Sequence, residues 1–394
     1  MIASLVSPRL LLVGGGAVAR TAEILRTLGL ARPLVVTDPF MVSSSLLARC
    51  LDPLAAAGIV ADVFSDTVPE PTDTVVEAGV ARWTGHGYDC LIGFGGGSPI
   101  DTAKAMAILA HGRATGAGQH MRDFKVPVAA DAGGLPIIAI PTTAGTGSEA
   151  TRFTVITDTE RGEKMLIAGM GALPLAAIVD YELTFTLPKR ITADTGVDSL
   201  THALEAFVSR RANPYSDTQA LAAMRLIGAN LRTAYAEPDN ASAREAMMLG
   251  ALQAGIAFTN SSVALVHGMS RPIGAHFHVP HGLSNAMLLP AITRFGIEAA
   301  EGRYARASRE IGFADAADSD PVAAERLAKG LTALNRDLDV PTPSAFGIDK
   351  GEWNAKLEVM ARQAVASGSP ANNPRIPSEA EIIALYNAVW SGNH

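Results

Sequence analysis

The stretch best equipped for chemistry is residues 197–205, VDSLTHALE, where a helical pattern carries an aspartate and a histidine. Asp198 and His202 are four residues apart, and side chains with this spacing lie on one face of a helix, about 6 Å apart. The carboxylate and the imidazole therefore form either a buried hydrogen-bonded pair or two ligands of one metal ion. Asp194 lies one turn earlier, but Gly196 comes between, so we expect Asp194 to cap or support the pair.

Two further histidines favour the metal interpretation. His267 and His281 lie in HGMSRPIGAHFHVPHGLSNAMLLP, where prolines and glycines interrupt the helical pattern, so we expect His267 to close one helix and His281 to open the next. One aspartate with three histidines and no thiolate suits a catalytic iron(II) or zinc ion rather than a structural zinc ion. His276 and His278 are rival ligands that spacing does not exclude.

The composition is that of an ordinary globular protein, with 394 residues, 48% hydrophobic and 18% charged. A net charge of -7 argues against a nucleic-acid or anionic-membrane partner. Cys50 and Cys90 are the only cysteines, so neither a disulfide framework nor a cysteine zinc site can form. No apolar run has the length of a membrane span, and the first one, residues 10–13, is too short for a signal peptide. We therefore expect a cytoplasmic protein.

The elements that must position these residues fall into two groups. From Arg9 to about Thr184, short β-rich runs alternate with helical patterns, which predicts a Rossmann-like parallel sheet with helices on both faces. After Leu187 the β signal nearly vanishes, and helix follows helix to the end. We predict an α/β dinucleotide-binding domain over residues 1–187 and an all-α metal-binding, catalytic domain over residues 188–394.

Three glycine-bearing turns of the first domain favour a dinucleotide site. Residues 14–19 fit G-x-G-x-x-A, and Asp38 follows about twenty residues later, at the position of the acid that binds the adenosine ribose, so we predict NAD rather than NADP. Residues 95–98 join a strand to a helix whose free N–H groups attract phosphate. Residues 141–149 form a hydroxyl-rich loop that could wrap a nucleotide. Any one of the three could be a tight turn, but together they favour a dinucleotide site.

These motifs resemble the iron-containing (group III) alcohol dehydrogenase family. The run GGGSPIDTAK looks like its GGGSxxDxAK signature, and PTTAGTGSE is similar to its PTTxGTGSE loop. The resemblance implies the dehydroquinate synthase-like fold of that family and Fe2+ on Asp198, His202, His267 and His281. By position, it implies that the cofactor residues are Gly95, Gly96, Gly97, Ser98, Asp101, Thr142, Thr143, Thr146 and Lys164.

The same resemblance implies an NAD-dependent dehydrogenase of small alcohols, or reductase of aldehydes, that forms a homodimer or larger homo-oligomer. Where the family commonly has a histidine proposed to relay protons, this chain has Arg271, which stays charged and cannot replace it. Arg271 and His278 are the candidate catalytic residues, and Arg271 predicts a carboxylate-bearing substrate unless its partner is Asp194 or a cofactor phosphate. The alternative function is a zinc-dependent polyol (glycerol-type) dehydrogenase, or another metal-dependent chemistry on this fold.

Overall fold

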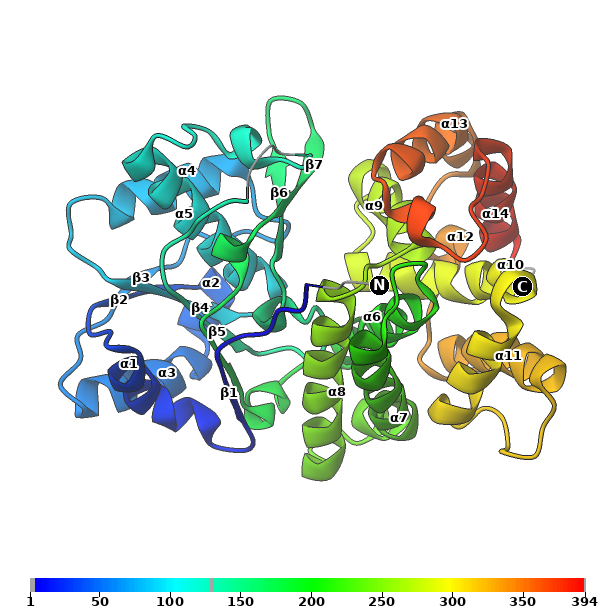
Figure 1. The fold of residues 1–394 in the computed structure, drawn as a ribbon, viewed down its shortest axis with the longest axis horizontal. Helices are drawn as coiled ribbons and strands as arrows, with labels where there is room; N and C mark the ends of the chain where they lie inside the picture. Colours follow the sequence, from blue (N-terminus) through cyan, green and yellow to red (C-terminus); the bar gives the residue numbers. More distant parts are fainter. Residues whose placement is uncertain (1–3, 128–130, 393–394) are drawn as a thin grey trace. The chain divides into compact units, whose positions relative to one another are not determined.

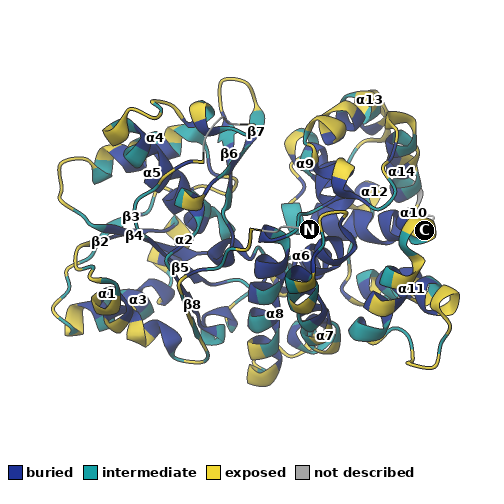
Figure 2. Cartoon of the chain, in the orientation of Figure 1, coloured by how far each residue is buried: buried dark blue, intermediate teal, exposed yellow. Residues whose placement is uncertain are grey.

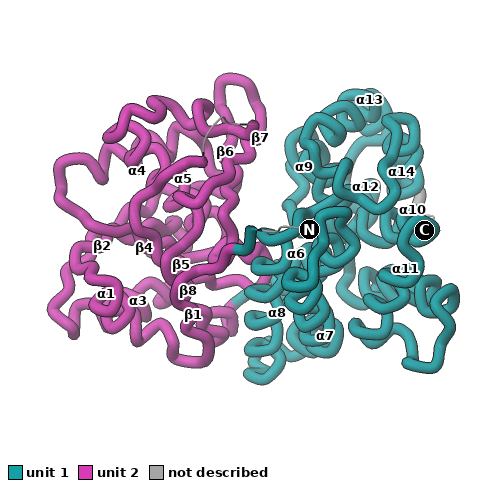
Figure 3. Tube along the Cα trace, viewed as in Figure 1, with its two compact units in different colours: residues 1–5, 187–394 teal, residues 6–186 magenta. Residues whose placement is uncertain are grey.

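The computed structural model describes residues 4–127 and 131–392, which fall into two compact units (Figure 3). Residues 6–186 form an α/β unit. The other described residues, 4–5 and 187–392, form a helical unit. No helix in these described ranges combines the length and the apolar character needed to cross a bilayer.

The α/β unit is built on a six-stranded parallel sheet with the strand order β1-β8-β5-β4-β2-β3 (Figure 1). The strands are β1 (Leu10–Val13), β2 (Pro33–Val36), β3 (Asp62–Phe64), β4 (Cys90–Gly95), β5 (Ile137–Pro141) and β8 (Ala176–Val179). The middle strands are buried along their whole length (Figure 2), as expected for a parallel sheet covered on both faces. The predicted parallel sheet is therefore confirmed.

Helices cover both faces of this sheet. They are η1 (Ala17–Arg20), α1 (Thr21–Leu28), α2 (Pro39–Ser43), α3 (Leu46–Ala56), α4 (Asp73–Trp83) and α5 (Gly97–Thr115). Neighbouring residues of β4 point to opposite faces, so Leu91 packs in one core with α4 and α5 while Ile92 packs in the other with α1 and α3. A separate antiparallel hairpin consists of β6 (Phe153–Asp158) and β7 (Glu163–Ala168).

The helical unit has no strand among its described residues. Its helices are α6 (Lys189–Val208), α7 (Pro214–Ala236), α8 (Ala241–Thr259), α9 (Leu265–Phe277), α10 (His281–Ile311), α11 (Asp320–Asp337), α12 (Pro343–Phe346), α13 (Lys350–Ala366), the 3-10 helix η6 (Ser369–Asn372) and α14 (Glu379–Ser391). The all-helical prediction for this part of the chain is confirmed.

Helix α6 runs without interruption through Gly196, which the sequence pattern treats as a break. A Cβ at this position would lie 2.3 Å from Cδ1 of Leu231 in α7, so the missing side chain allows α6 and α7 to approach closely. The tertiary contact outweighs the low helix propensity of glycine, which costs about 1 kcal/mol relative to alanine. Asp194 therefore lies on the same helix as Asp198.

Helix α9 also differs from the prediction, because His267 lies in its first turn and does not close the preceding helix. The helix continues through Pro272, although proline lacks the N–H that would bond to the preceding turn. The buried Tyr386 hydroxyl donates a hydrogen bond of 2.7 Å to the carbonyl of Met269, beside the disturbed turn. The acceptor that loses its helical partner at Pro272 is the carbonyl of Gly268, one residue earlier, and the helix nevertheless continues to Phe277. His281 opens α10 as predicted.

Candidate functional site

Three helices bring the four predicted metal ligands together. Helix α6 supplies Asp198 and His202 from adjacent turns, α9 supplies His267 from its first turn, and α10 supplies His281 as its first residue. One oxygen of Asp198, Oδ1, lies 3.5 Å from Nε2 of His267 and 3.9 Å from Nε2 of both other histidines. All three imidazoles therefore present Nε2 to the same carboxylate oxygen.

The ligand atoms of Asp198, His267 and His281 all lie within 4.8 Å of one another, a grouping that could hold a metal ion. His202 is not part of this group of three. Its ring stacks against the rings of His267 and Phe258, with centroids 4.5 and 4.3 Å away, and its role as the fourth ligand stays a prediction. The side chains of Asp198, His202 and His267 are almost entirely buried, whereas that of His281 is 40% exposed. Such a site is closed on the α6 side and open beside His281, and catalytic metal sites keep an open position for substrate.

A glycine allows the first turn of α10 to approach α6. A Cβ on Gly282 would lie 2.4 Å from the carbonyl oxygen of Asp194 and 2.8 Å from its carbonyl carbon. Both atoms belong to the backbone of α6 and cannot turn aside as the end of a side chain can. Only glycine therefore fits beside His281 at this helix contact.

Glu205, buried on α6, holds His267 in a fixed orientation. One carboxylate oxygen accepts from the backbone N–H of Val266 at 2.5 Å, and the other lies 2.6 Å from Nδ1 of His267. When Nδ1 donates its proton to this carboxylate, the lone pair of Nε2 faces Asp198. Carboxylate partners of this kind orient metal-ligating histidines and raise their basicity.

Two buried serines perform the same task for His281. The Ser284 hydroxyl donates to the carbonyl of His281 at 2.9 Å, so its oxygen accepts from Ser270 at 2.6 Å. The Ser270 oxygen can then accept the Nδ1 proton of His281, 3.2 Å away. This direction of donation satisfies both serine hydroxyls and leaves Nε2 of His281 as a hydrogen-bond acceptor.

The amide of Asn285, one turn after His281, provides a test of whether a cation fits among these ligands. Its Nδ2 lies 2.7 Å from Oδ1 of Asp198 and 3.2 Å from Nε2 of both His267 and His281. The acceptors of three residues thus point at one electropositive group, and Oδ1 of Asn285 is buried without a hydrogen-bond partner in the described part of the chain. A divalent cation suits this donor set, and it would replace the amide protons as their partner.

The electrostatics agree with this assignment. Burial alone would raise the pKa of the Asp198 carboxyl, but the three neighbouring imidazoles outweigh burial and hold that pKa well below its ordinary value. Burial would lower the pKa of His267, but the nearby carboxylates of Glu205 and Asp198 prevail and raise it. Asp198 is therefore an anion at neutral pH, as a metal ligand must be.

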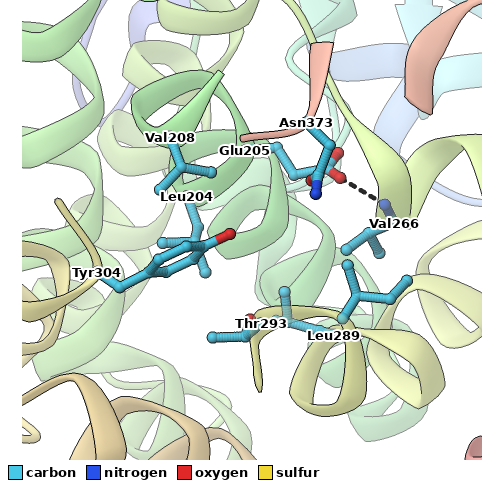
Figure 4. A pocket seen from close by; sticks show the side chains of 9 residues that line it. Leu204, Glu205, Val208, Val266, Leu289, Thr293, Tyr304 and Asn373 are labelled. Carbon is cyan, nitrogen blue, oxygen red and sulfur yellow. Dashed lines mark hydrogen bonds between the residues drawn. The ribbon is translucent and has the colours of Figure 1, made fainter. Parts of the chain in front are cut away.

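A small pocket, with room for roughly one water molecule, is lined by Glu205 of α6 and Val266 of α9, among others (Figure 4). Figure 4 shows the hydrogen bond from Val266 to Glu205 and the ring of Tyr304 on the opposite wall. Burial raises the pKa of Tyr304, and the charge of Glu205 adds to the shift. The Tyr304 hydroxyl therefore stays protonated beside the carboxylate that orients His267.

The remaining candidate residues on α9 and α6, and His278 after α9, are not among these ligands. His276 contacts Oε1 of Gln363 through Nε2 at 2.9 Å, and His278 is exposed at the C-cap of α9. Neither is part of the group that could hold a metal, and the catalytic role of His278 stays a prediction. Arg271 donates to Oγ of Ser369 at 2.9 Å. Asp194 pairs with Arg190 at 2.6 Å.

The second and third glycine turns lie side by side in the α/β unit. The Thr142 N–H donates to the carbonyl of Gly95 at 2.8 Å, and Oγ1 of Thr142 is buried without a hydrogen-bond partner among the described residues. A Cβ on Gly97 would lie 2.8 Å from Cγ2 of Thr146, and one on Gly96 would lie 3.6 Å from Cγ2 of Thr143. This cradle adjoins the N-terminus of α5, where a phosphate group would meet free N–H groups.

Asp38 follows β2, the strand beside β4. Its Oδ1 caps α2 by accepting from Met41 N at 2.9 Å, while Oδ2 would lie 3.6 Å from a Cβ on Gly95. The order of connections reverses between β2 and β4, and open α/β sheets bind ligands beyond the strand ends at such a point. Asp38 and residues 95–98 border it together.

The first glycine turn is organised differently. The backbone N–H groups of Gly16 and Val18 donate to the two carboxylate oxygens of Asp180, at 3.2 and 3.1 Å. The G-x-G-x-x-A pattern is therefore satisfied by a carboxylate from the end of β8, and these N–H groups are not free for phosphate. The interpretation of this turn as part of the dinucleotide site is wrong at these two positions.

Two charged residues of the family motifs are engaged within the α/β unit. The carboxylate of Asp101 accepts from Oγ of Ser148 at 2.6 Å and from N of Val155 at 3.0 Å, so it ties α5 to the third turn and to β6. Lys164, on β7, forms an ion pair of 2.5 Å with Glu70. Direct contact of either residue with the cofactor stays a prediction.

Sequence reasoning missed Glu205, Ser270, Ser284 and Asn285. Glu205 had a signal, because it lies seven residues after Asp198 and so on the same helix face. Asn285 likewise lies four residues after His281. The two serines gave no such signal, since their contact depends on how α9 packs against α10.

Comparison with known proteins identifies relatives along the whole chain. The family described as "Iron-containing alcohol dehydrogenase" matches residues 8–181, and "Fe-containing alcohol dehydrogenase family, C-terminal" matches residues 192–390. The NAD-dependent methanol dehydrogenase of Bacillus methanolicus is 34% identical over 95% of this chain and 96% of its own.

Solved structures of related enzymes have the same fold as this chain. A 1,3-propanediol oxidoreductase has a TM-score of 0.93 at 33% identity, covering 99% of this chain and 100% of that one. A sulfoacetaldehyde reductase from Bifidobacterium kashiwanohense in complex with NAD+ has a TM-score of 0.87 at 30% identity, covering 99% of both chains.

Proposed function

This chain belongs to the iron-containing alcohol dehydrogenase family, and from that premise we propose that it transfers hydride between NAD and a small alcohol or aldehyde with the help of Fe2+. The observation that carries the proposal is the convergence of three imidazole Nε2 atoms on one oxygen of Asp198. The relatives described above are named for short alcohols and aldehydes, which supports a substrate of that size.

Asp198, His202, His267 and His281 would hold the metal. An ion bound there supplies Lewis acidity toward the oxygen of the alcohol or aldehyde. The protein itself contributes orientation: Glu205 and Ser270 keep the Nδ1 atoms of two ligands engaged, so that Nε2 of each is directed to the site. Three histidines rather than two do not favour the alternative zinc-dependent polyol dehydrogenase.

The cofactor would lie against residues 95–98 and residues 142–146, with its pyrophosphate at the start of α5. Asp38 would accept hydrogen bonds from the adenosine ribose and repel the 2′-phosphate of NADP. The NAD+ complex of the sulfoacetaldehyde reductase supports this choice of cofactor. Family membership also supports a cytoplasmic homo-oligomer, with a dimer as its smallest form.

The proposal is tested by metal analysis combined with an alcohol panel. Protein loaded anaerobically with Fe(II) should bind one metal per chain, reduce NAD with short primary alcohols, and lose activity in air. His281→Ala should weaken metal binding by orders of magnitude because the remaining ligands cannot complete the coordination sphere.

His276→Ala is the matched control, because His276 is on α9 but contacts Gln363. It should retain the metal. If His276→Ala loses the metal while His281→Ala keeps it, the ligand assignment is wrong. Loaded wild-type protein that turns over no alcohol or aldehyde would refute the proposed activity.

A further inference from the structure

We propose that Arg271 binds an anionic group at the far end of the substrate, so that the enzyme prefers aldehydes carrying a carboxylate over uncharged aldehydes of equal length. This inference rests on the proposed function and narrows its substrate class. It is carried by the position of Arg271 one helical turn after a predicted metal ligand and by the lack of a carboxylate partner for its guanidinium among the described residues.

The position follows from the course of α9. Arg271 comes four residues after His267, and the helix continues without a break past both residues to Phe277. Side chains with this spacing lie one above the other on the same face. Arg271 therefore extends along the helix face that carries His267, at the distance of one helical turn from the ligand.

The guanidinium has one hydrogen bond to a described residue, from Nη1 to Oγ of Ser369 at 2.9 Å. Ser369 opens η6 and is itself buried, so it fixes one corner of the planar group. Arginine has five N–H donors in a rigid fork, and a neutral hydroxyl occupies one of them. The fork that remains matches the two oxygens of a carboxylate.

Nearby acids are already engaged. Arg271 forms no ion pair within residues 4–127 and 131–392. Glu205, whose charge acts on Arg271, uses both oxygens for Val266 and His267. Asp194 pairs with Arg190. The protein-derived partner considered from sequence is thus bound elsewhere, whereas Arg303 of the same unit has its own carboxylate, Asp217, at 2.6 Å.

The charge balance calls for an anion. Arginine does not lose its proton in proteins, and burying a charge without a partner is costly. Arg271 is partly buried, and its burial lowers the pKa of the guanidinium, as expected for a cation that is withdrawn from water. A divalent ion at the site would be balanced by Asp198 and Glu205, which leaves the charge of Arg271 uncompensated. A substrate carboxylate would complete the balance, and the metal and the arginine would then hold opposite ends of one molecule.

The test compares 4-oxobutanoate with butanal, which have four carbons each and differ in the carboxylate. Wild type should have the higher kcat/KM for 4-oxobutanoate. In Arg271→Gln, the ratio of the two kcat/KM values should fall roughly 10- to 150-fold, the range expected when a charge-assisted hydrogen-bonded pair is lost. Arg271→Lys keeps the positive charge but not the forked N–H donors, so its ratio of kcat/KM values should lie between those of wild type and Arg271→Gln.

Arg294→Gln is the matched control, because it removes an exposed guanidinium of α10 that pairs with Glu325. Its substrate ratio should equal that of wild type. An unchanged ratio in Arg271→Gln overturns the inference. So does an effect confined to the KM for NAD, which would assign the guanidinium to a cofactor phosphate.

A binding measurement separates this inference from the proposed function. Calorimetric titration with butanoate needs no turnover, and wild type should bind it at least ~10-fold more tightly than Arg271→Gln. Equal affinities overturn the anion site even in an active enzyme. Wild-type protein that reduces neither aldehyde refutes the proposed function, and the titration then still decides whether Arg271 binds carboxylates.

Discussion

Replacing Gly282 by alanine should weaken metal binding without unfolding the helical unit. The added Cβ would lie 2.4 Å from the carbonyl oxygen of Asp194, against about 3.4 Å for an ordinary contact, so the first turn of α10 must move away from α6 by about 1.0 Å. His281 is the preceding residue and moves with it. Bound metals tolerate ligand displacements of only about 0.2 Å. We therefore expect the affinity for the metal to fall roughly 10- to 100-fold or more, since the loss of a residue that supports a metal ligand already has an effect of that size.

The measurement is competition for Fe(II) or Zn(II) against a chelator of known affinity, with circular dichroism as a check on folding. Gly302→Ala is the matched control in the same helix, because a Cβ there meets nothing closer than Oδ2 of Asp320 at 3.4 Å. It should bind metal like wild type. If Gly282→Ala is folded and binds metal as tightly as Gly302→Ala, the close contact between α6 and α10 does not set the position of His281.

Two further predictions concern the α/β unit. Burial raises the pKa of Glu149 from 4.5 to about 7, so the folded state holds a proton that the unfolded state releases, and the free energy of unfolding should fall as pH rises from 4.5 to 7, by up to ~1.4 kcal/mol per pH unit. Glu149→Gln should flatten this slope in guanidinium chloride titrations, and equal slopes in variant and wild type would contradict the assignment. Asp38→Gly should reduce the preference for NAD over NADP, measured as the ratio of the two kcat/KM values. Wild type with equal efficiencies for both cofactors would refute that role of Asp38.

The sequence predicts the fold well wherever hydrophobic periodicity is strong. The buried runs of β2, β4 and β5 and the helical patterns between them indicated the parallel sheet. Strand β3 was not predicted, since it has three residues and only Phe64 is buried. Helix α4 was also missed, and Gly79 weakens its pattern. A Cβ on Gly79 would lie 2.4 Å from Sδ of Met106 in α5, so a tertiary contact again requires the residue that helix propensity disfavours.

The site was predictable where it depends on spacing along one helix. The spacing of four positions from Asp198 to His202 places both on one face of α6, and the structure has them there. Spacing could not show which further residues meet them. The contact of Ser270 with His281 depends on α9 passing through Pro272 and packing against α10, which is contrary to the local signal of proline.

The carboxylate of Asp180 across the first glycine turn has a consequence for how this unit can be recombined with those of relatives. In folds where one βα segment carries the phosphate-binding turn, that segment can be exchanged between relatives together with its cofactor contacts. Here the corresponding turn is bound to a side chain more than 160 positions further along the chain. The groups proposed to hold the cofactor come instead from the connections after β2, β4 and β5. Replacing residues 10–31 by those of another family member would therefore change a structural contact with Asp180. We expect it to leave the preference between NAD and NADP unchanged.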